Sequence, residues 1–308
     1  GASALMAVPA GAVTLKEKVD TTRVLLSAGV PIHELNCVRK HLSAVKGGRL
    51  ALATPGRVLT LAISDVISPV EDDPSVIGSG PTVGDETTFA DALVIVDRPG
   101  IRERVPSSVL RLLERGRDGL VSETMEDGNL SPARAMYRVI GSRREAMAGA
   151  LLTARKLGYQ AVAINRAIEG EARVVGVNHP ERALVAGQQL IGPRCVVSSG
   201  ETTVTVSGGG RGGRNQELAL AALSELSSLG SEAVLASVGT DGVDGPTDAA
   251  GAMVDSTTGL RANAMGLSSP ESYLADNNAY EYFNQLGDLI RTGPTGTNVG
   301  DLQVVLTQ

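Results

Sequence analysis

The sequence predicts an α/β protein with a mostly parallel sheet, and three observations predict it. Short runs of aliphatic and β-branched residues alternate with longer segments whose apolar residues recur at helical spacing. Glycine is enriched, with 37 of 308 residues gathered in bunches that separate these segments. Apolar residues make up 42% of the chain, which is enough for a large core. The length favours two domains, or one large one.

The first part of the chain predicts helices around one strand. Residues 13–28 form a helix, because Thr14 and Glu17 match a capping box and Gly29 follows. Residues 58–64 are a continuous apolar run, which is typical of a buried parallel strand. The other predicted helices lie at residues 35–53, interrupted at Gly47-Gly48, and at 89–96 and 107–115.

A polar stretch without periodicity, residues 116–132, predicts a linker between a domain at 1–132 and a domain at 133–308. Beyond it, strands alternate with helices again, as expected of an α/β domain. The run at 203–206 alternates Thr and Val, so we expect a half-exposed strand there. The other predicted strands are 139–140, 161–164, 195–198 and 233–238, and the predicted helices are 143–157, 180–191 and 215–226.

Composition excludes several classes of protein. A net charge of −6, with 2% aromatic residues, argues against nucleic-acid binding. No apolar run reaches the ~18 residues that a membrane span needs. Cys37 and Cys195 allow no disulfide framework or zinc site, so we expect a reducing cytoplasm. The three histidines lack metal spacing and are expected at the surface or at helix caps. The opening residues resemble the middle of a glycine-rich loop, so we infer that the true N-terminus precedes Gly1.

Three predicted strands are followed by an acidic residue among small ones. These residues are Asp65, Glu201 and Asp241. Ligands in open α/β sheets bind beyond the carboxyl ends of strands, and Mg²⁺ is typically held by one or two carboxylates with phosphate oxygens. Turn chemistry explains each acid taken singly. Three in one chain favour a magnesium–phosphate site.

The segment 207–217 (SGGGRGGRNQE) is the sharpest feature of the sequence. Gly208, Gly210 and Gly213 match the G-x-G-x-x-G spacing of dinucleotide loops. Arg211 and Arg214 lie inside the turn, where guanidinium groups instead suit a transferring phosphoryl group. A flexible hairpin with solvated arginines remains an alternative.

Other segments combine glycine, hydroxyl and cationic side chains. Turns at residues 78–82 and 293–298 expose backbone N–H groups that can bind anions. Arg39 and Lys46 belong to a basic stretch that suits a small carboxylate or a phosphate, although a solvated face explains it equally well. The motifs of Walker-type NTPases, nucleophile-elbow hydrolases and protein kinases are absent from the sequence.

Together these segments resemble the glycerate 2-kinase family, whose C-terminal part is called the MOFRL domain. The matching segments keep the family's order: residues 1–5, 36–49, 64–66, 78–82, 170–172, 199–202, 212–217, 239–251 and 292–301. The resemblance implies two α/β domains, the first a Rossmann-like parallel sheet whose N-terminal part is missing here, and the second with a mixed sheet. It places the active site in the cleft between them, and it implies that a catalytic lysine precedes Gly1.

The resemblance implies ATP-dependent phosphorylation of D-glycerate at its 2-hydroxyl, with Mg²⁺. Arg214, assisted by Arg211, is then expected to contact the transferring phosphoryl group. The metal ligands are expected among Asp241, Glu201 and Asp65, and the substrate ligands are Arg39, Lys46 and Ser3. The expected nucleotide- or phosphate-binding residues are Gly78, Ser79, Gly80, Thr82, Gly212, Gly213, Asn215, Thr295, Thr297 and Asn298.

Three other readings stay open. The G-x-G-x-x-G spacing also suits an NAD(P)H-dependent hydroxypyruvate reductase. The absent N-terminal part suits a catalytically impaired fragment that binds a nucleotide or a sugar acid. A kinase for a related hydroxy acid fits as well, because the substrate side chain is not specified. We expect neither a nucleic-acid partner nor a membrane partner. A homodimer is compatible with the sequence.

Overall fold

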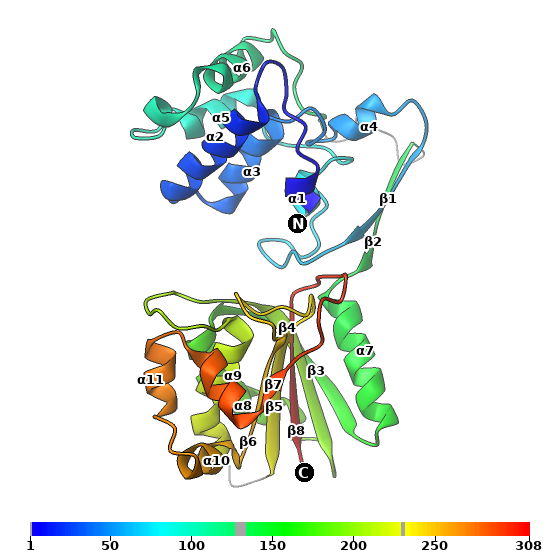
Figure 1. The fold of residues 1–308 in the computed structure, drawn as a ribbon. Coiled ribbons are helices and arrows are strands. Elements are labelled where there is room, and N and C mark those ends of the chain that lie inside the picture. The colour runs from blue at the N-terminus through cyan, green and yellow to red at the C-terminus, as the bar shows by residue number, and fades with distance from the viewer. Residues whose placement is uncertain (1, 127–133, 229–231) are drawn as a thin grey trace. The chain divides into compact units, whose positions relative to one another are not determined.

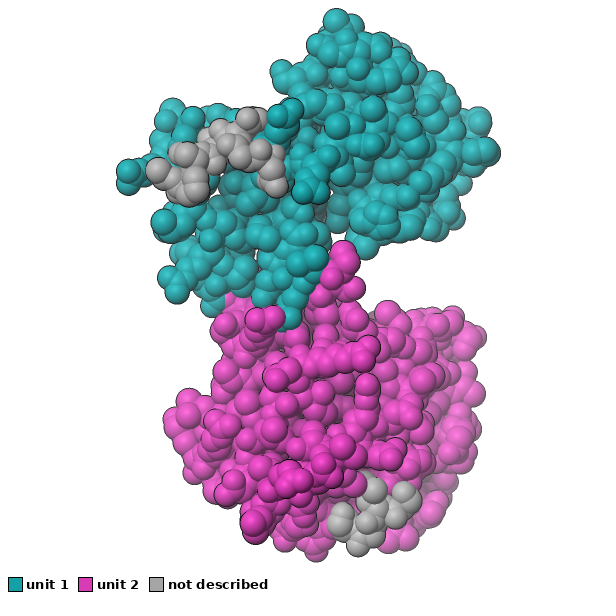
Figure 2. Space-filling model, turned by 180° about the vertical axis from the view of Figure 1, so that it is seen from behind, with its two compact units in different colours: residues 1–62, 70–140 teal, residues 63–69, 141–308 magenta. Residues whose placement is uncertain are grey.

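The computed structural model of the chain describes residues 2–126, 134–228 and 232–308. They divide into two compact units, which Figure 2 distinguishes by colour. Unit 1 comprises Gly1–Ala62 and Val70–Ile140, and unit 2 comprises Ile63–Pro69 and Gly141–Gln308. The predicted domain boundary at 132/133 lies outside the described residues, so it stays a prediction.

Unit 1 consists of helices around an apolar core and contributes to a two-stranded sheet (Figure 1). Thr14 caps α2 with Glu17 in a capping box, which confirms the predicted helix start. Phe89 and Leu113 are fully buried, and a Cβ at Gly116 would collide with the Phe89 ring. The helices are α1 (Ala2–Leu5), α2 (Leu15–Ser27), α3 (Ile32–His41), α4 (Arg49–Ala53), η1 (Ile77–Ser79), α5 (Phe89–Val96), η2 (Arg102–Arg104) and α6 (Ser107–Arg117).

The two-stranded sheet pairs β1 (Val58–Ile63) with β2 (Ala135–Gly141). It is parallel, because Val58 N donates to Arg134 O while Ser64 N donates to Gly141 O. The prediction of a buried strand at 58–64 is wrong in one respect. Three of its side chains are exposed, because no described element covers that face: Leu59 (61%), Leu61 (57%) and Ile63 (50%).

Unit 2 is a six-stranded mixed sheet with helices on both faces. The strand order is β3-β4-β8-β5-β6-β7, with β3 and β4 parallel and β8 antiparallel to both β4 and β5. The helix α7 packs on one face, while α8 and α9 pack on the other around the larger core (Figure 1). The strands are β3 (Gln160–Glu171), β4 (Arg194–Thr203), β5 (Ala233–Gly239), β6 (Gly251–Asp255), β7 (Leu289–Ile290) and β8 (Asp301–Thr307). The helices are α7 (Arg143–Lys156), α8 (Ala172–Gly187), α9 (Arg214–Ser228), α10 (Thr258–Ala264), α11 (Pro270–Ala275) and α12 (Ala279–Leu286).

The structure corrects three local predictions in this unit. The separate strand at 203–206 does not form, because β4 runs on to Thr203 and the chain then enters a loop. The helix predicted at 180–191 is α8, which begins eight residues earlier and carries Pro180 inside it rather than at its start. His179 is 1% exposed, and His41 in unit 1 is fully buried, so neither is a surface residue.

Candidate active site

Two predicted acids of unit 2, Glu201 and Asp241, lie at one edge of the sheet, where Arg214 contacts Glu201. Because β8 runs antiparallel between β4 and β5, its first residue, Asp301, pairs with Gly200 on one side and with Gly239 on the other. Glu201 lies next to the first glycine, near the end of β4, and Asp241 follows β5. The carboxyl ends of two strands and the start of a third therefore bring these carboxylates to one place.

Arg214, the first residue of α9, is held by two carboxylates at this edge. Its Nε lies 2.7 Å from Asp301 Oδ2 and its Nη2 donates to Asp301 Oδ1 at 2.9 Å, a bidentate arrangement. Its Nη1 donates to Glu201 Oε1 at 2.7 Å. The Arg214 side chain is 30% exposed, whereas Asp301 is fully buried. Asp301 and Glu201 thus fix the guanidinium of Arg214, and this side chain remains partly accessible to a ligand.

Burial and charge oppose each other in this pair. Burial disfavours the Arg214 charge, but the hydrogen bonds and charges of Asp301 and Glu201 outweigh it and raise the pKa of the guanidinium. For Asp301, burial raises the pKa of the carboxyl to about 6, against the opposing effect of Arg214. Arg214 therefore stays charged at neutral pH, while its buried partner titrates on the acidic side of neutrality.

A chain of buried polar side chains fixes the start of α9. The Asp244 carboxylate accepts the backbone N–H groups of Asn215 (3.1 Å) and Gln216 (2.9 Å), as a carboxylate at a helix N-terminus does. Asn215 Oδ1 accepts a hydrogen bond from Ser237 Oγ on β5 (2.6 Å). Burial raises the pKa of Asp244, and these hydrogen bonds oppose it. The network leaves Arg214 little freedom to move.

The glycines of the 207–213 loop serve close packing. A Cβ at Gly208 or Gly210 would collide with the 276–278 turn, and a Cβ at Gly213 would collide with Asp244. The loop's N–H groups are also occupied. Those of residues 207 and 208 donate to Asn277 Oδ1, those of 209 and 210 to Asp276, and that of 211 to Asn278 Oδ1. The G-x-G-x-x-G spacing thus reflects packing, and this part of the loop has no free amides for a pyrophosphate.

Two amides at the end of the loop differ from the rest. Within the described residues, the N–H groups of Gly212 and Gly213 have no hydrogen-bond partner. They immediately precede Arg214 and the N-terminus of α9, where backbone amides favour anions. Arg211, by contrast, is exposed and stacks 4.5 Å over the Tyr280 ring. Of the two predicted arginines, Arg214 is the better placed for phosphate.

The loop after β5 and the loop before β8 are joined by hydrogen bonds. Thr295 N donates to Asp241 O (3.1 Å), and Thr295 Oγ1 donates to Thr240 O (2.6 Å). Asn298 Nδ2 donates to Asp65 Oδ2 at 2.9 Å. A Cβ at Gly245 would collide with Gly212 O, so the Asp241 loop directly contacts the loop that precedes Arg214. The structure therefore brings the predicted residues of unit 2 together.

The predicted residues of unit 1 form a second group. Lys46 is 1% exposed, and its Nζ donates to Ser3 O (2.8 Å), Ser3 Oγ (2.9 Å) and Gly78 O (3.0 Å). Ser79 Oγ is 2.9 Å from Ser3 Oγ, and Thr82 Oγ1 is 2.7 Å from Thr60 Oγ1. Gly78, Ser79 and Gly80 are all left-handed, with φ of 62°, 64° and 60°. All three donors of Lys46 are therefore used within the protein.

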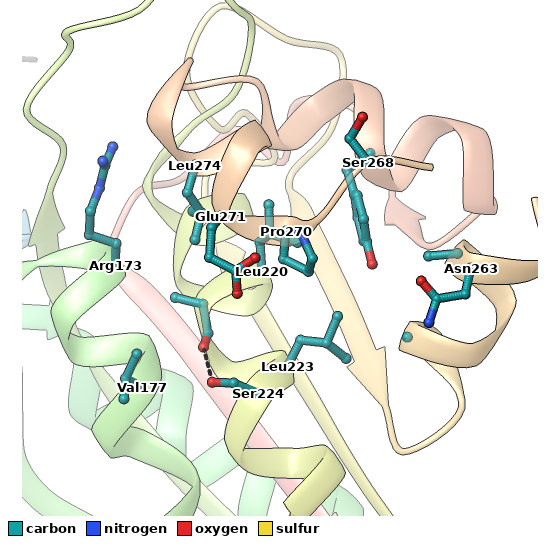
Figure 3. Close-up of a pocket in the computed structure, with 14 residues that line it drawn as sticks. Arg173, Val177, Leu220, Leu223, Ser224, Asn263, Ser268, Pro270, Glu271 and Leu274 are labelled. Carbon is teal, nitrogen blue, oxygen red and sulfur yellow. Dashed lines mark hydrogen bonds between the residues drawn. The ribbon is translucent and has the colours of Figure 1, made fainter. Parts of the chain in front are cut away.

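A pocket of unit 2, of about 440 Å³, contains none of the predicted site residues. It lies among α8, α9 and the helices α10 to α12, where Leu220, Leu223 and Val177 line it (Figure 3). Its charged lining residues are Arg173 and Glu271, and Arg214 does not line it. We therefore place the candidate site at the strand ends.

Sequence reasoning missed Asp301 and Asp244. Asp301 begins β8, a strand that is not among those predicted from the sequence. Asp244 belongs to the run rich in Asp and Gly after β5, in which only Asp241 is a predicted site residue. An alternation of apolar and polar residues at 301–307 was the available signal for β8.

The carboxylates of the site fit a Mg²⁺ ion only together with phosphate. Within the described residues there is no group of three or more His, Cys, Asp and Glu that could hold a metal ion. Glu201 is 46% exposed, and Asp241 is partly exposed with one oxygen accepting Val243 N. One or two such carboxylates suffice where phosphate oxygens complete the coordination. In the same part of the chain, no helix has both the length and the apolar character to cross a membrane.

Comparisons with known proteins cover the length of the chain. A family model described as a domain of unknown function (DUF4147) matches residues 1–114, and the MOFRL family model matches 194–301. A glycerate 2-kinase from Pyrococcus horikoshii is 41% identical over 99% of this chain and 68% of its own length. An Agrobacterium vitis protein named as an unproven hydroxypyruvate reductase is 40% identical, with coverage of 99% and 68%.

The crystal structure of a glycerate kinase from Thermotoga maritima superposes with a TM-score of 0.86 at 38% identity, covering all of this chain and 71% of that one. Two α/β units with a parallel and a mixed sheet, as the sequence led us to expect, are thus shared with solved relatives. The chain therefore belongs to the glycerate kinase family that carries the MOFRL domain.

Proposed function

We propose that this chain catalyses the transfer of the γ-phosphoryl group of ATP to the 2-hydroxyl of D-glycerate. Similarity over the whole chain to glycerate kinases supports the reaction type. The observation that carries the proposal is Arg214, a guanidinium fixed by Asp301 and Glu201 beside two unpaired backbone amides. Phosphoryl transfer depends mainly on positioning and on neutralising charge, and these groups supply both.

The remaining roles follow from accessibility. Gly212 and Gly213 donate N–H groups to phosphate oxygens, and Arg214 contacts the phosphoryl group as it transfers. Asp241 and Glu201 would hold Mg²⁺, with Asp65 next to Asn298 as a further carboxylate. The ion would neutralise phosphate charge when bound. Asn215 acts indirectly, since its side chain is engaged with Ser237 and Asp244.

The reductase alternative finds less support. It relied on the G-x-G-x-x-G spacing at residues 208–213, whose glycines pack against neighbouring backbone and side chains. The first four N–H groups of this motif are already bonded. A dinucleotide loop needs those amides for the pyrophosphate. We also propose a cytoplasmic location, in keeping with Cys37 and Cys195, which are buried and unpaired.

One assay tests the proposal against its alternatives. The chain is incubated with ATP, Mg²⁺ and D-glycerate, ADP formation is followed by enzymatic coupling, and the phosphorylated carbon is identified by NMR. We expect 2-phosphoglycerate. A parallel reaction with NADPH and hydroxypyruvate should show no change in nicotinamide absorbance. Nicotinamide oxidation without ATP-dependent turnover would replace the kinase by a reductase, and binding without either reaction would leave an impaired fragment.

A further inference from the structure

Lys18 is a buried lysine that has no counter-ion among the residues that the structure describes. It lies on the inward face of α2, the face that also carries Thr21, Val24 and Leu25. The residue is 6% exposed, and its ammonium nitrogen is buried with no hydrogen-bond partner. A buried charge left in this state destabilises a fold unless an opposite charge offsets it.

The charged groups that act on Lys18 are positive. Burial, together with the charge of Arg39 on α3, lowers the pKa of Lys18 to about 8. Burial, Lys18 and Arg39 together lower the pKa of Lys46, also to about 8. Arg39 is half-buried, and within the described ranges it has no ion pair or hydrogen bond. Three cations therefore act on one another here, and no carboxylate of the described residues offsets the charge of Lys18 or Arg39.

The same unit pairs another buried lysine, Lys40, with a carboxylate. Lys40 Nζ lies 3.1 Å from Asp85 Oδ1, and both side chains are almost inaccessible. Lys46 is satisfied in another way, because its three donors bind Ser3 and Gly78. Lys46 therefore ties the left-handed Gly78–Gly80 loop to α1. Of Lys18, Arg39, Lys40 and Lys46, Lys18 and Arg39 are the two that have no hydrogen-bond partner among the described residues.

We propose that Lys18 and Arg39 form an anion subsite that takes the carboxylate of the hydroxy-acid substrate. Lys46 then acts as a positioning residue for the neighbouring loop. The planar guanidinium of Arg39 suits a carboxylate, and the flexible stem of Lys18 lets its ammonium turn toward the bound anion. The identity of the acid as D-glycerate rests on the proposed function, whereas the existence of the subsite does not.

Equilibrium binding tests this without requiring turnover. Calorimetric titrations compare the unaltered chain, Lys18→Met and a control, Lys16→Met, whose side chain lies two residues away on the same helix and is 85% exposed. The probes are D-glycerate, its uncharged methyl ester, and ATP. We expect Lys18→Met to raise the Kd for D-glycerate about tenfold or more, since a charge-assisted contact is lost. Lys16→Met should change it less than twofold.

Two further readouts separate binding from folding. The melting temperature of unliganded Lys18→Met should equal or exceed that of the unaltered chain, because methionine keeps the stem and removes the unpaired charge. The methyl ester should bind all three proteins equally. If Lys18→Met does not fold, Arg39→Gln decides in its place, with the same tenfold loss expected.

An unchanged Kd for D-glycerate in the deciding variant overturns the subsite. A loss of ATP affinity with D-glycerate binding intact also overturns it, in favour of a nucleotide phosphate. Failure of the subsite leaves the kinase assay untouched. Conversely, Lys18-dependent binding without ATP-dependent turnover would retain the subsite and reject the proposed function.

Discussion

The Asp301→Asn substitution tests how Arg214 is positioned. The carboxylate of Asp301 meets Arg214 Nε and Nη2 at 2.7 and 2.9 Å. An amide carries no charge and keeps a single acceptor oxygen, so one charge-assisted bond is lost, worth about 1.5–3 kcal/mol. The exposed Glu201 is then the main anchor. A displaced guanidinium should lower kcat by about 10- to 100-fold.

The pH dependence gives a sharper test of the same pair. Because burial raises the pKa of Asp301 to about 6, its carboxylate becomes protonated and releases Arg214 as the pH falls through that value. The kcat of the unaltered chain should therefore fall below pH 6. Asparagine does not titrate, so the Asp301→Asn variant should lack this decline. Measurements of kcat from pH 5 to 8 at saturating substrates keep protonation of free ATP out of the comparison.

A matched control lies in the same unit. Asp288 is buried and accepts two hydrogen bonds from Arg261, at 3.0 and 2.8 Å, away from the strand ends that form the site. Asp288→Asn should cost similar stability yet leave kcat within about twofold and its pH profile unchanged. The reasoning is refuted if Asp301→Asn keeps the decline near pH 6, or if both variants lose the same activity.

Three further predictions concern the same edge of the sheet. Gly213→Ala should destabilise the fold by about 1–3 kcal/mol and reduce activity, because its Cβ would collide with Asp244, whereas Gly209→Ala meets open space and should be neutral in thermal unfolding. Arg214→Ala should lower kcat by ~10³ or more while the chain stays folded, and near-normal turnover would remove Arg214 from the site. Asp241→Asn should raise the Mg²⁺ concentration needed for half-maximal activity, and an unchanged titration would exclude Asp241 as a ligand.

The sequence by itself determined the elements whose signals are local. The capping box of Thr14 and Glu17 marks the start of α2. The apolar patterns of residues 89–96 and 233–238 predict a helix and a strand, and the structure confirms both. Helix caps and buried runs depend on neighbours within a few residues, so a single sequence carries them. The polar ends of the strands also indicated where the candidate site would lie.

Only the tertiary structure decided how the site is assembled. Asp301 matters because β8 inserts antiparallel between β4 and β5, a pairing of segments about 60 and 100 residues apart that no local pattern encodes. The glycines near Arg214 suggested a dinucleotide loop, yet their spacing follows from contact with the 276–278 turn and Asp244. Likewise, no local pattern distinguishes Lys18 from Lys16 on the same helix, and only the fold buries Lys18 within reach of the charge of Arg39. Burial and long-range pairing set the charge state and freedom of these side chains, and both arise only once the chain has folded.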